Sequence, residues 1–171
     1  DISTLLIDRG VDTAIGCAVG LVVLYATSRR DDAGLRKALD DTMAAARKML
    51  AKLAAGDVTS ATARRARIGL RNAAVDMVLF YEAQTGMGGR AREEADRLWP
   101  ATVAAQRLAF RILAACWEFE ATGARALTPA EGVRLEVALR NIEATDRAMP
   151  AGFLAGEFAT LRAALAKARL T

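Results

Sequence analysis

Two opposite charges stand close together near the start of the chain, Arg9 and Asp12. Residues three apart lie on one face of a helix, so these two side chains can pair. Both flank a long apolar run, where ionisable groups form either an interfacial ion pair or the lining of a polar path. A guanidinium would suit an anionic carboxylate there, because its planar fork of donors matches the two carboxylate oxygens. Arg9 and Asp12 are therefore candidates for an interfacial ion pair or for the lining of a polar path.

A second group could bind an aromatic anion. Two arginines, Arg107 and Arg111, could serve as anion partners in a pocket lined by aromatic side chains. The aromatic candidates are Phe80, Tyr81, Trp99, Phe110, Trp117 and Phe119. The ordinary alternative is that the aromatic side chains belong to a core and the arginines to a solvated helix face.

The composition argues against catalysis and metal binding. The chain has no His, the commonest general base and metal ligand. Cys17 and Cys116 lie far apart and form no Cys-x-x-Cys pair, which argues against a zinc site or a disulfide scaffold. The sequence around Gly86 lacks the Lys and Ser/Thr of a phosphate-binding loop. We expect no enzyme, no cofactor and no metal, and the net charge of +4 is too weak to predict a nucleic-acid partner.

The longest apolar run of the chain, TAIGCAVGLVVLYATS, lies between Asp12 and Arg29. A helix over residues 2–27 would be about 39 Å long at about 1.5 Å per residue, enough to cross a hydrocarbon core of roughly 30 Å. Gly16 and Gly20 would let a second helix pack closely against it. The pair Arg29-Arg30 would mark its cytoplasmic end. Alternatively, residues 13–27 form the central core helix of a soluble bundle.

The rest of the chain predicts an α-helical bundle of about five helices with short loops. Apolar residues recur at helical spacing, Gly and Pro interrupt the pattern, and no segment alternates with a period of two. Pro100 should kink the third of these helices, and Thr128-Pro129-Ala130-Glu131 has the pattern of a helix start. The expected helices cover residues 33–55, 60–85, 91–121, 129–149 and 154–169.

The expected helix over residues 60–85 carries two apolar stripes, which suggests neighbours on two sides. One stripe consists of Ile68, Val75 and Leu79, and the other of Leu70, Ala74, Met77 and Tyr81. In the following helix Val103, Phe110, Leu113 and Trp117 are expected to share one face. We expect all of these stripes to be core.

The run from Arg9 to Gly20 resembles the fusaric acid resistance family, also described as aromatic acid exporters. In that family an Arg, an Asp-Thr pair and a Gly one turn later lie in the last helix of a transmembrane bundle, and Arg9, Asp12, Thr13 and Gly16 match this pattern. A helical cytoplasmic domain rich in Ala and Arg follows, and Leu98-Trp99 fits it loosely. The specific match covers about residues 9–28. The other membrane helices of the family are absent from this sequence.

The resemblance implies the C-terminal segment of an inner-membrane transporter for aromatic or other organic acids. Residues 1–28 would be the terminal transmembrane helix, and residues 29–171 a cytoplasmic bundle that serves assembly or gating. Its partners would be membrane lipid, the other transmembrane helices of the same protein or of an oligomer, and an aromatic carboxylate substrate. The alternative is a soluble α-helical interaction domain or a ligand-binding regulatory domain.

Overall fold

A computed structural model describes residues 34–144 and 150–170 of the chain. The chain divides into two units, Asp1–Gly34 and Leu35–Thr171, and the fold described here is that of the second. Within the described ranges the structure is all-α, as predicted, and it has five helices. They are α2 (Gly34–Ala54), α3 (Ala61–Met87), α4 (Gly89–Thr122), α5 (Pro129–Arg140) and α6 (Ala155–Leu170).

The predictions for the N-terminal span lie outside the described residues. They concern the helix over residues 1–28 and its four site residues, Arg9, Asp12, Gly16 and Gly20. Over residues 34–144 and 150–170, none of the helices combines the length and the apolar character needed to cross a membrane.

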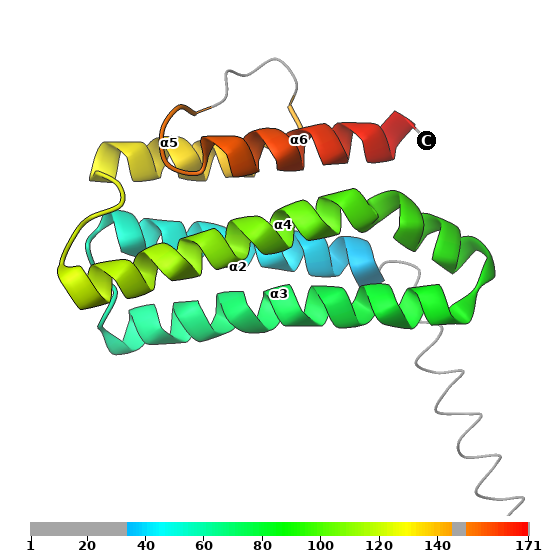
Figure 1. Ribbon diagram of the computed structural model, residues 1–171, viewed down its shortest axis with the longest axis horizontal. Helices are drawn as coiled ribbons and strands as arrows, with labels where there is room; N and C mark the ends of the chain where they lie inside the picture. The colour runs from blue at the N-terminus through cyan, green and yellow to red at the C-terminus, as the bar shows by residue number, and fades with distance from the viewer. Residues whose placement is uncertain (1–33, 145–149, 171) are drawn as a thin grey trace, which may run out of the picture. The chain divides into compact units, whose positions relative to one another are not determined.

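The central element of the bundle is α4, the longest of the described helices. Figure 1 shows α3 and α6 on opposite sides of α4 and α2 behind it, and α3 and α6 are the two helices with which α4 makes its most extensive contacts. The core is built mainly from Ala, Leu and Met, with Phe158 of α6 fully buried. The many alanines allow close approach of the helices, and Leu and Met fill the remaining space.

A hydrogen bond through a hydroxyl joins α2 to α3. The Oγ1 atom of Thr42, which is buried, lies 2.8 Å from the carbonyl oxygen of Ala38 and 3.0 Å from that of Ala73 in α3. The donor is thus satisfied inside the core, as a buried hydroxyl requires. Thr42 therefore fixes the register between the two helices as well as filling space.

The end of α2 follows the Schellman pattern. Gly56 has a φ of 73°, its N–H donates to the Leu53 carbonyl, and the N–H of Asp57 donates to the Lys52 carbonyl. The side chain of Ser60 then caps α3 by accepting from the N–H of Ala63. Hydrogen bonds from the Ser60 hydroxyl and from Lys52 lower the pKa of the Asp57 carboxyl. The turn between the helices is therefore specified by local polar contacts.

The two-stripe prediction for α3 is wrong for one of the stripes. Leu70, Ala74 and Met77 are buried in the core, whereas Ile68 is 52% exposed, Val75 45% and Leu79 55%. Because successive residues of a helix are rotated by about 100°, the exposed stripe of Ile68, Val75 and Leu79 lies on the side of α3 opposite its core face. The predicted loop before α4 is also shorter, because Gly86 and Met87 belong to α3 and the break falls at Gly88.

The face predicted for α4 is split in the same way. Leu113 is buried, but Phe110 and Trp117 are exposed. The helix continues through Pro100, which cannot donate the usual hydrogen bond. Figure 1 shows that the N-terminal part of α4 bends away from the axis of the rest, as predicted for a helix with an internal proline.

The predicted start of α5 is confirmed, and its predicted length is wrong. Thr128 and Glu131 form a reciprocal capping box, with Pro129 in the first turn. The N–H of Thr128 is the main cause that lowers the pKa of the Glu131 carboxyl. The helix ends at Arg140, capped by Asn141, and does not continue through Ile142, which is buried beyond its end. Tertiary packing therefore buries Ile142, although it does not belong to the helix that was expected to contain it.

The closest approach between α5 and α2 depends on one glycine. A Cβ atom at Gly132 would lie 2.1 Å from the Cβ of Ala54 and 3.2 Å from the Cδ1 of Leu127. Gly132 is itself buried. Any larger residue here would have to push the two helices apart.

Candidate functional site

A pocket of about 480 Å³ lies between the middle of α4 and the first turns of α6. Arg107, Phe110 and Arg111 of α4 line one side, each within four residues of the next, so that the helical repeat brings them together. Glu157 and Thr160 of α6 are on the other side. The small residues Ala104 and Gly156 complete the lining.

The pocket has a net positive charge. Arg111 Nε donates to Glu157 Oε1 at 3.1 Å, so one of the two arginines is neutralised across the α4–α6 contact. Arg107 has no ion pair or hydrogen bond with any residue that the structure describes. An exposed guanidinium beside a phenyl ring can bind a planar anion through both charge and stacking. The chemistry available here is therefore binding of a small aromatic anion.

Only part of the predicted aromatic set contributes to this pocket. Phe110 lies there with Arg107 and Arg111, as the sequence suggested. Tyr81 and Trp99 instead stack on each other, with ring centroids 4.1 Å apart, and join α3 to the start of α4. Phe119 lies under the guanidinium of Arg125, 6.0 Å from it. Phe80 and Trp117 are exposed, and neither lines this pocket.

The partner side of the pocket could not be found from the sequence. Glu157 and Thr160 belong to α6, 46 residues or more beyond Arg111. No local pattern says which helix lies next to α4, because every amphipathic helix of the chain could occupy that place. The only local signal was the spacing of Arg107, Phe110 and Arg111.

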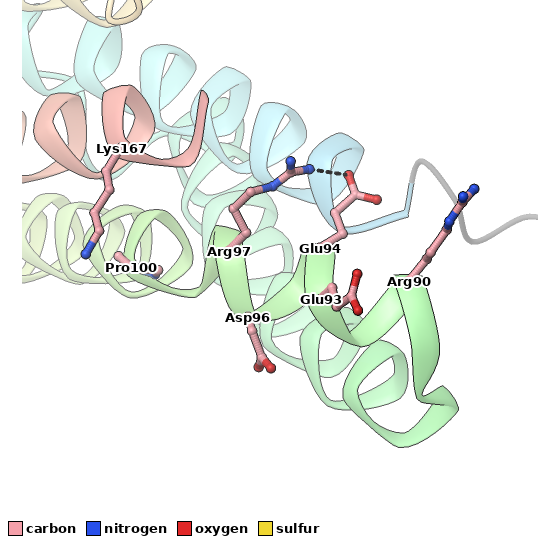
Figure 2. A pocket seen from close by; sticks show the side chains of 7 residues that line it. All are labelled: Arg90, Glu93, Glu94, Asp96, Arg97, Pro100 and Lys167. Carbon is pink, nitrogen blue, oxygen red and sulfur yellow. Dashed lines mark ion pairs between the residues drawn. The ribbon is translucent and has the colours of Figure 1, made fainter. Parts of the chain in front are cut away.

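A larger hollow of about 600 Å³ lies near the bend of α4, lined by charged residues and Pro100. Figure 2 shows the carboxylates of Glu93, Glu94 and Asp96 pointing in different directions, with only the pair between Arg97 and Glu94, 3.9 Å apart, drawn together. Among the residues that the structure describes, no group of His, Cys, Asp and Glu could hold a metal ion. The side chains around this hollow form a solvated, charged surface and no convergent site.

Glu120, near the end of α4, forms an ion pair with Arg67 of α3 at 2.5 Å, and the hydrogen bond from Arg67 lowers the pKa of the Glu120 carboxyl. Beside them, burial raises the pKa of the Cys116 thiol to about 11. A thiol with that pKa stays protonated at neutral pH and is a poor nucleophile. These residues stabilise the α3–α4 contact.

One face of α3 remains uncovered by any other described part of the bundle, and it exposes Ile68, Val75 and Leu79. On α4, Phe110 and Trp117 are exposed as well, and Phe110 lies at the pocket beside α6. Scattered apolar side chains are ordinary on a surface, but rows of large ones at helical spacing mark places where another surface binds. The α3 row is therefore the second candidate site of the molecule.

Comparison of the chain with protein-family models, with curated proteins and with solved structures finds no match to any of them. The assignment of function therefore depends on the sequence pattern near the N-terminus and on the two candidate sites of the bundle.

Proposed function

We propose that this chain is the C-terminal segment of an inner-membrane transporter that resembles the aromatic acid exporters. Residues 1–28 are its last transmembrane helix, with Arg9 and Asp12 on the path of the substrate and Gly16 and Gly20 packed against neighbouring spans. Residues 29–171 form a cytoplasmic bundle that assembles the transporter.

The proposal for residues 1–28 rests on the sequence. Their uncharged run begins at Thr13 and is flanked by Arg29-Arg30 on one side and by Arg9 and Asp12 on the other, and Arg9, Asp12 and Thr13 match the family pattern. A substrate with a carboxylate needs a fixed cation where it leaves water, and a guanidinium is suited to that role.

The uncovered apolar row of α3 is the observation that carries the proposal for the bundle. The unit that contains it already has a closed core, so the large exposed side chains are not needed for folding. A folded bundle that leaves such rows on its surface is suited to binding another protein surface. An assembly role explains why Ile68, Val75 and Leu79 are apolar, which a solvated helix face does not require.

Membrane extraction tests this proposal. The full chain, expressed in bacteria, should remain in the membrane pellet after an alkaline carbonate wash. Replacing two residues of the apolar run, Val22→Asp with Val23→Asp, should release most of it, because each central carboxylate costs about 2.5–3.5 kcal/mol on insertion scales. Arg36→Asp in the bundle is the matched charge control and should stay in the pellet. Recovery of the unaltered chain in the wash would contradict the proposal.

A second candidate function is a ligand-binding regulatory domain, and the pocket between α4 and α6 favours it. There Arg107 stands beside Phe110 without an ion pair to the described residues, while Arg111 is held by Glu157. That arrangement suits a small aromatic carboxylate, with the ring on Phe110 and the anion on Arg107.

Thermal unfolding of the full chain with benzoate or salicylate tests the second candidate. A ligand that binds only the folded state raises the melting temperature progressively with its concentration. Arg107→Gln should abolish the rise, whereas Arg92→Gln, a change of the same kind elsewhere on α4, should leave it intact. If neither benzoate nor salicylate raises the melting temperature of the unaltered chain, the pocket is not such a site.

A further inference from the structure

The exposed row of α3 continues as a heptad-like pattern beyond its three apolar residues. The steps between its members alternate between three and four residues, which keeps them on one side of the helix. In chain order the row is Arg65, Ile68, Asn72, Val75, Leu79 and Glu82, all of them exposed. The row thus has an apolar centre, a basic end and an acidic end.

Two copies of this row complement each other when they run in opposite directions. If a second α3 lies antiparallel across the row, Ile68 of one chain faces Leu79 of the other, and Asn72 faces Val75. At each end Arg65 of one chain then faces Glu82 of the other. Within the described part of the chain neither Arg65 nor Glu82 has an ion pair, so both charges remain available for a partner.

A parallel arrangement would place identical residues opposite each other. Arg65 would face Arg65 and Glu82 would face Glu82, and like charges in facing positions repel. The charges therefore select the antiparallel arrangement, which a two-fold axis perpendicular to the two helices generates with the same surface on both chains.

The helix surface beside the row also permits close approach. Gly69 lies on the flank of the row, and a Cβ atom added there would meet nothing within 4 Å. No other helix described in the structure covers this side of α3, because the core-facing side is the opposite one, with Leu70, Ala74 and Met77. A second helix could therefore lie along the row without disturbing the core.

We propose that the partner of this row is a second copy of the chain, bound through an antiparallel α3–α3 contact about a two-fold axis. The inference rests on the proposed assembly role of the bundle and names the partner. One pair of helices forms a small interface, so the dimer is weak in dilute solution. Anchoring both copies in one membrane would raise their effective concentration and favour the contact.

The mass of the full chain in detergent micelles, measured by sedimentation with the detergent contribution subtracted, gives the first test. The unaltered chain should dimerise. Ile68→Lys with Leu79→Lys puts two ammonium groups into each of two facing layers and should raise the dissociation constant at least about 100-fold. The matched control is Val133→Lys with Val137→Lys on α5, where the native residues are 61% and 44% exposed. It should leave the dissociation constant unchanged.

Charge exchange tests the register. Arg65→Glu and Glu82→Arg should each weaken dimerisation about 3- to 10-fold. An exposed ion pair contributes little by itself, but the two-fold axis repeats the Arg65–Glu82 pair, so each substitution removes two of them. The double exchange should restore the native dissociation constant within about two-fold. The two residues are seventeen positions apart on one helix, so a contact within the chain cannot cause the rescue. Failure of the double exchange to recover dimerisation would overturn the antiparallel register.

Disulfide trapping tests the orientation independently. Asn72→Cys and Val75→Cys are made separately in a Cys17→Ser background, in which the remaining Cys116 is buried. When the two variants are mixed and oxidised, the mixed disulfide should exceed both symmetric ones. A predominance of the symmetric Asn72→Cys disulfide would show a parallel contact and overturn the inference.

The inference and the proposed function fail in different ways. A chain that is monomeric, or whose dimer survives Ile68→Lys with Leu79→Lys, overturns the α3 contact while membrane extraction is unaffected. A chain that dimerises through α3 but is recovered in the carbonate wash keeps the contact and contradicts the membrane segment.

Discussion

Replacing Gly132 with alanine is expected to destabilise the bundle more than other single-methyl additions to its helices. The added Cβ would lie 2.1 Å from the Cβ of Ala54, well inside contact distance, and the helix backbones fix the positions of both atoms. Overpacking of this kind costs about 1–3 kcal/mol. Urea unfolding followed by tryptophan fluorescence measures it, and both tryptophans, Trp99 and Trp117, lie in α4 and report on the bundle.

Two variants separate the clash from the ordinary effect of alanine in a helix. Gly69→Ala adds the same methyl group on the open side of α3 and should stabilise the chain by about 0.5–1 kcal/mol. Ala54→Gly removes the opposing Cβ, so combining it with Gly132→Ala should recover part of the lost stability. If Gly132→Ala were as stable as Gly69→Ala, α5 would not approach α2 as closely as the structure has it.

The helices of the bundle were largely predictable, because periodicity, caps and breakers are local properties of the sequence. The start of α5 shows this best: Thr128, Pro129 and Glu131 specify it within four residues, and the capping box forms as expected. The end of the same helix was not predictable, because Ile142 continues the apolar pattern although the chain leaves the helix at Asn141. Burial there comes from tertiary packing and not from the helix.

Periodicity reveals an apolar face but does not identify what covers it. The row of Ile68, Val75 and Leu79 follows the helical repeat just as the buried row of Leu70, Ala74 and Met77 does, and only the fold distinguishes the two. The same limit applies to Phe110, for which the sequence allowed both a core stripe and an aromatic pocket, and which is exposed at the pocket beside Arg107. Sequence patterns therefore located candidate sites, whereas exposure decided which of them remain available for binding.

Replacing Arg9 with alanine in the whole gene product is expected to abolish tolerance to an aromatic carboxylate such as fusaric acid. A hydrogen-bonded ion partner of a carboxylate contributes about 1.5–3 kcal/mol, and at the edge of a bilayer no water fully replaces it. Affinity on the path should fall roughly 10- to 100-fold. Arg9→Lys keeps the charge without the two-pronged geometry, so it should retain part of the tolerance. Arg36→Ala, in the bundle, should retain all of it, and immunoblots should show equal amounts of every variant.

Transport itself is measured most directly as the accumulation of radiolabelled benzoate in cells that carry the whole gene product. Cells with the native protein should hold several-fold less label than cells without it, and cells with Arg9→Ala should hold as much as cells without it. Equal accumulation in all three, with the protein present in the membrane, would contradict a transporter for aromatic carboxylates.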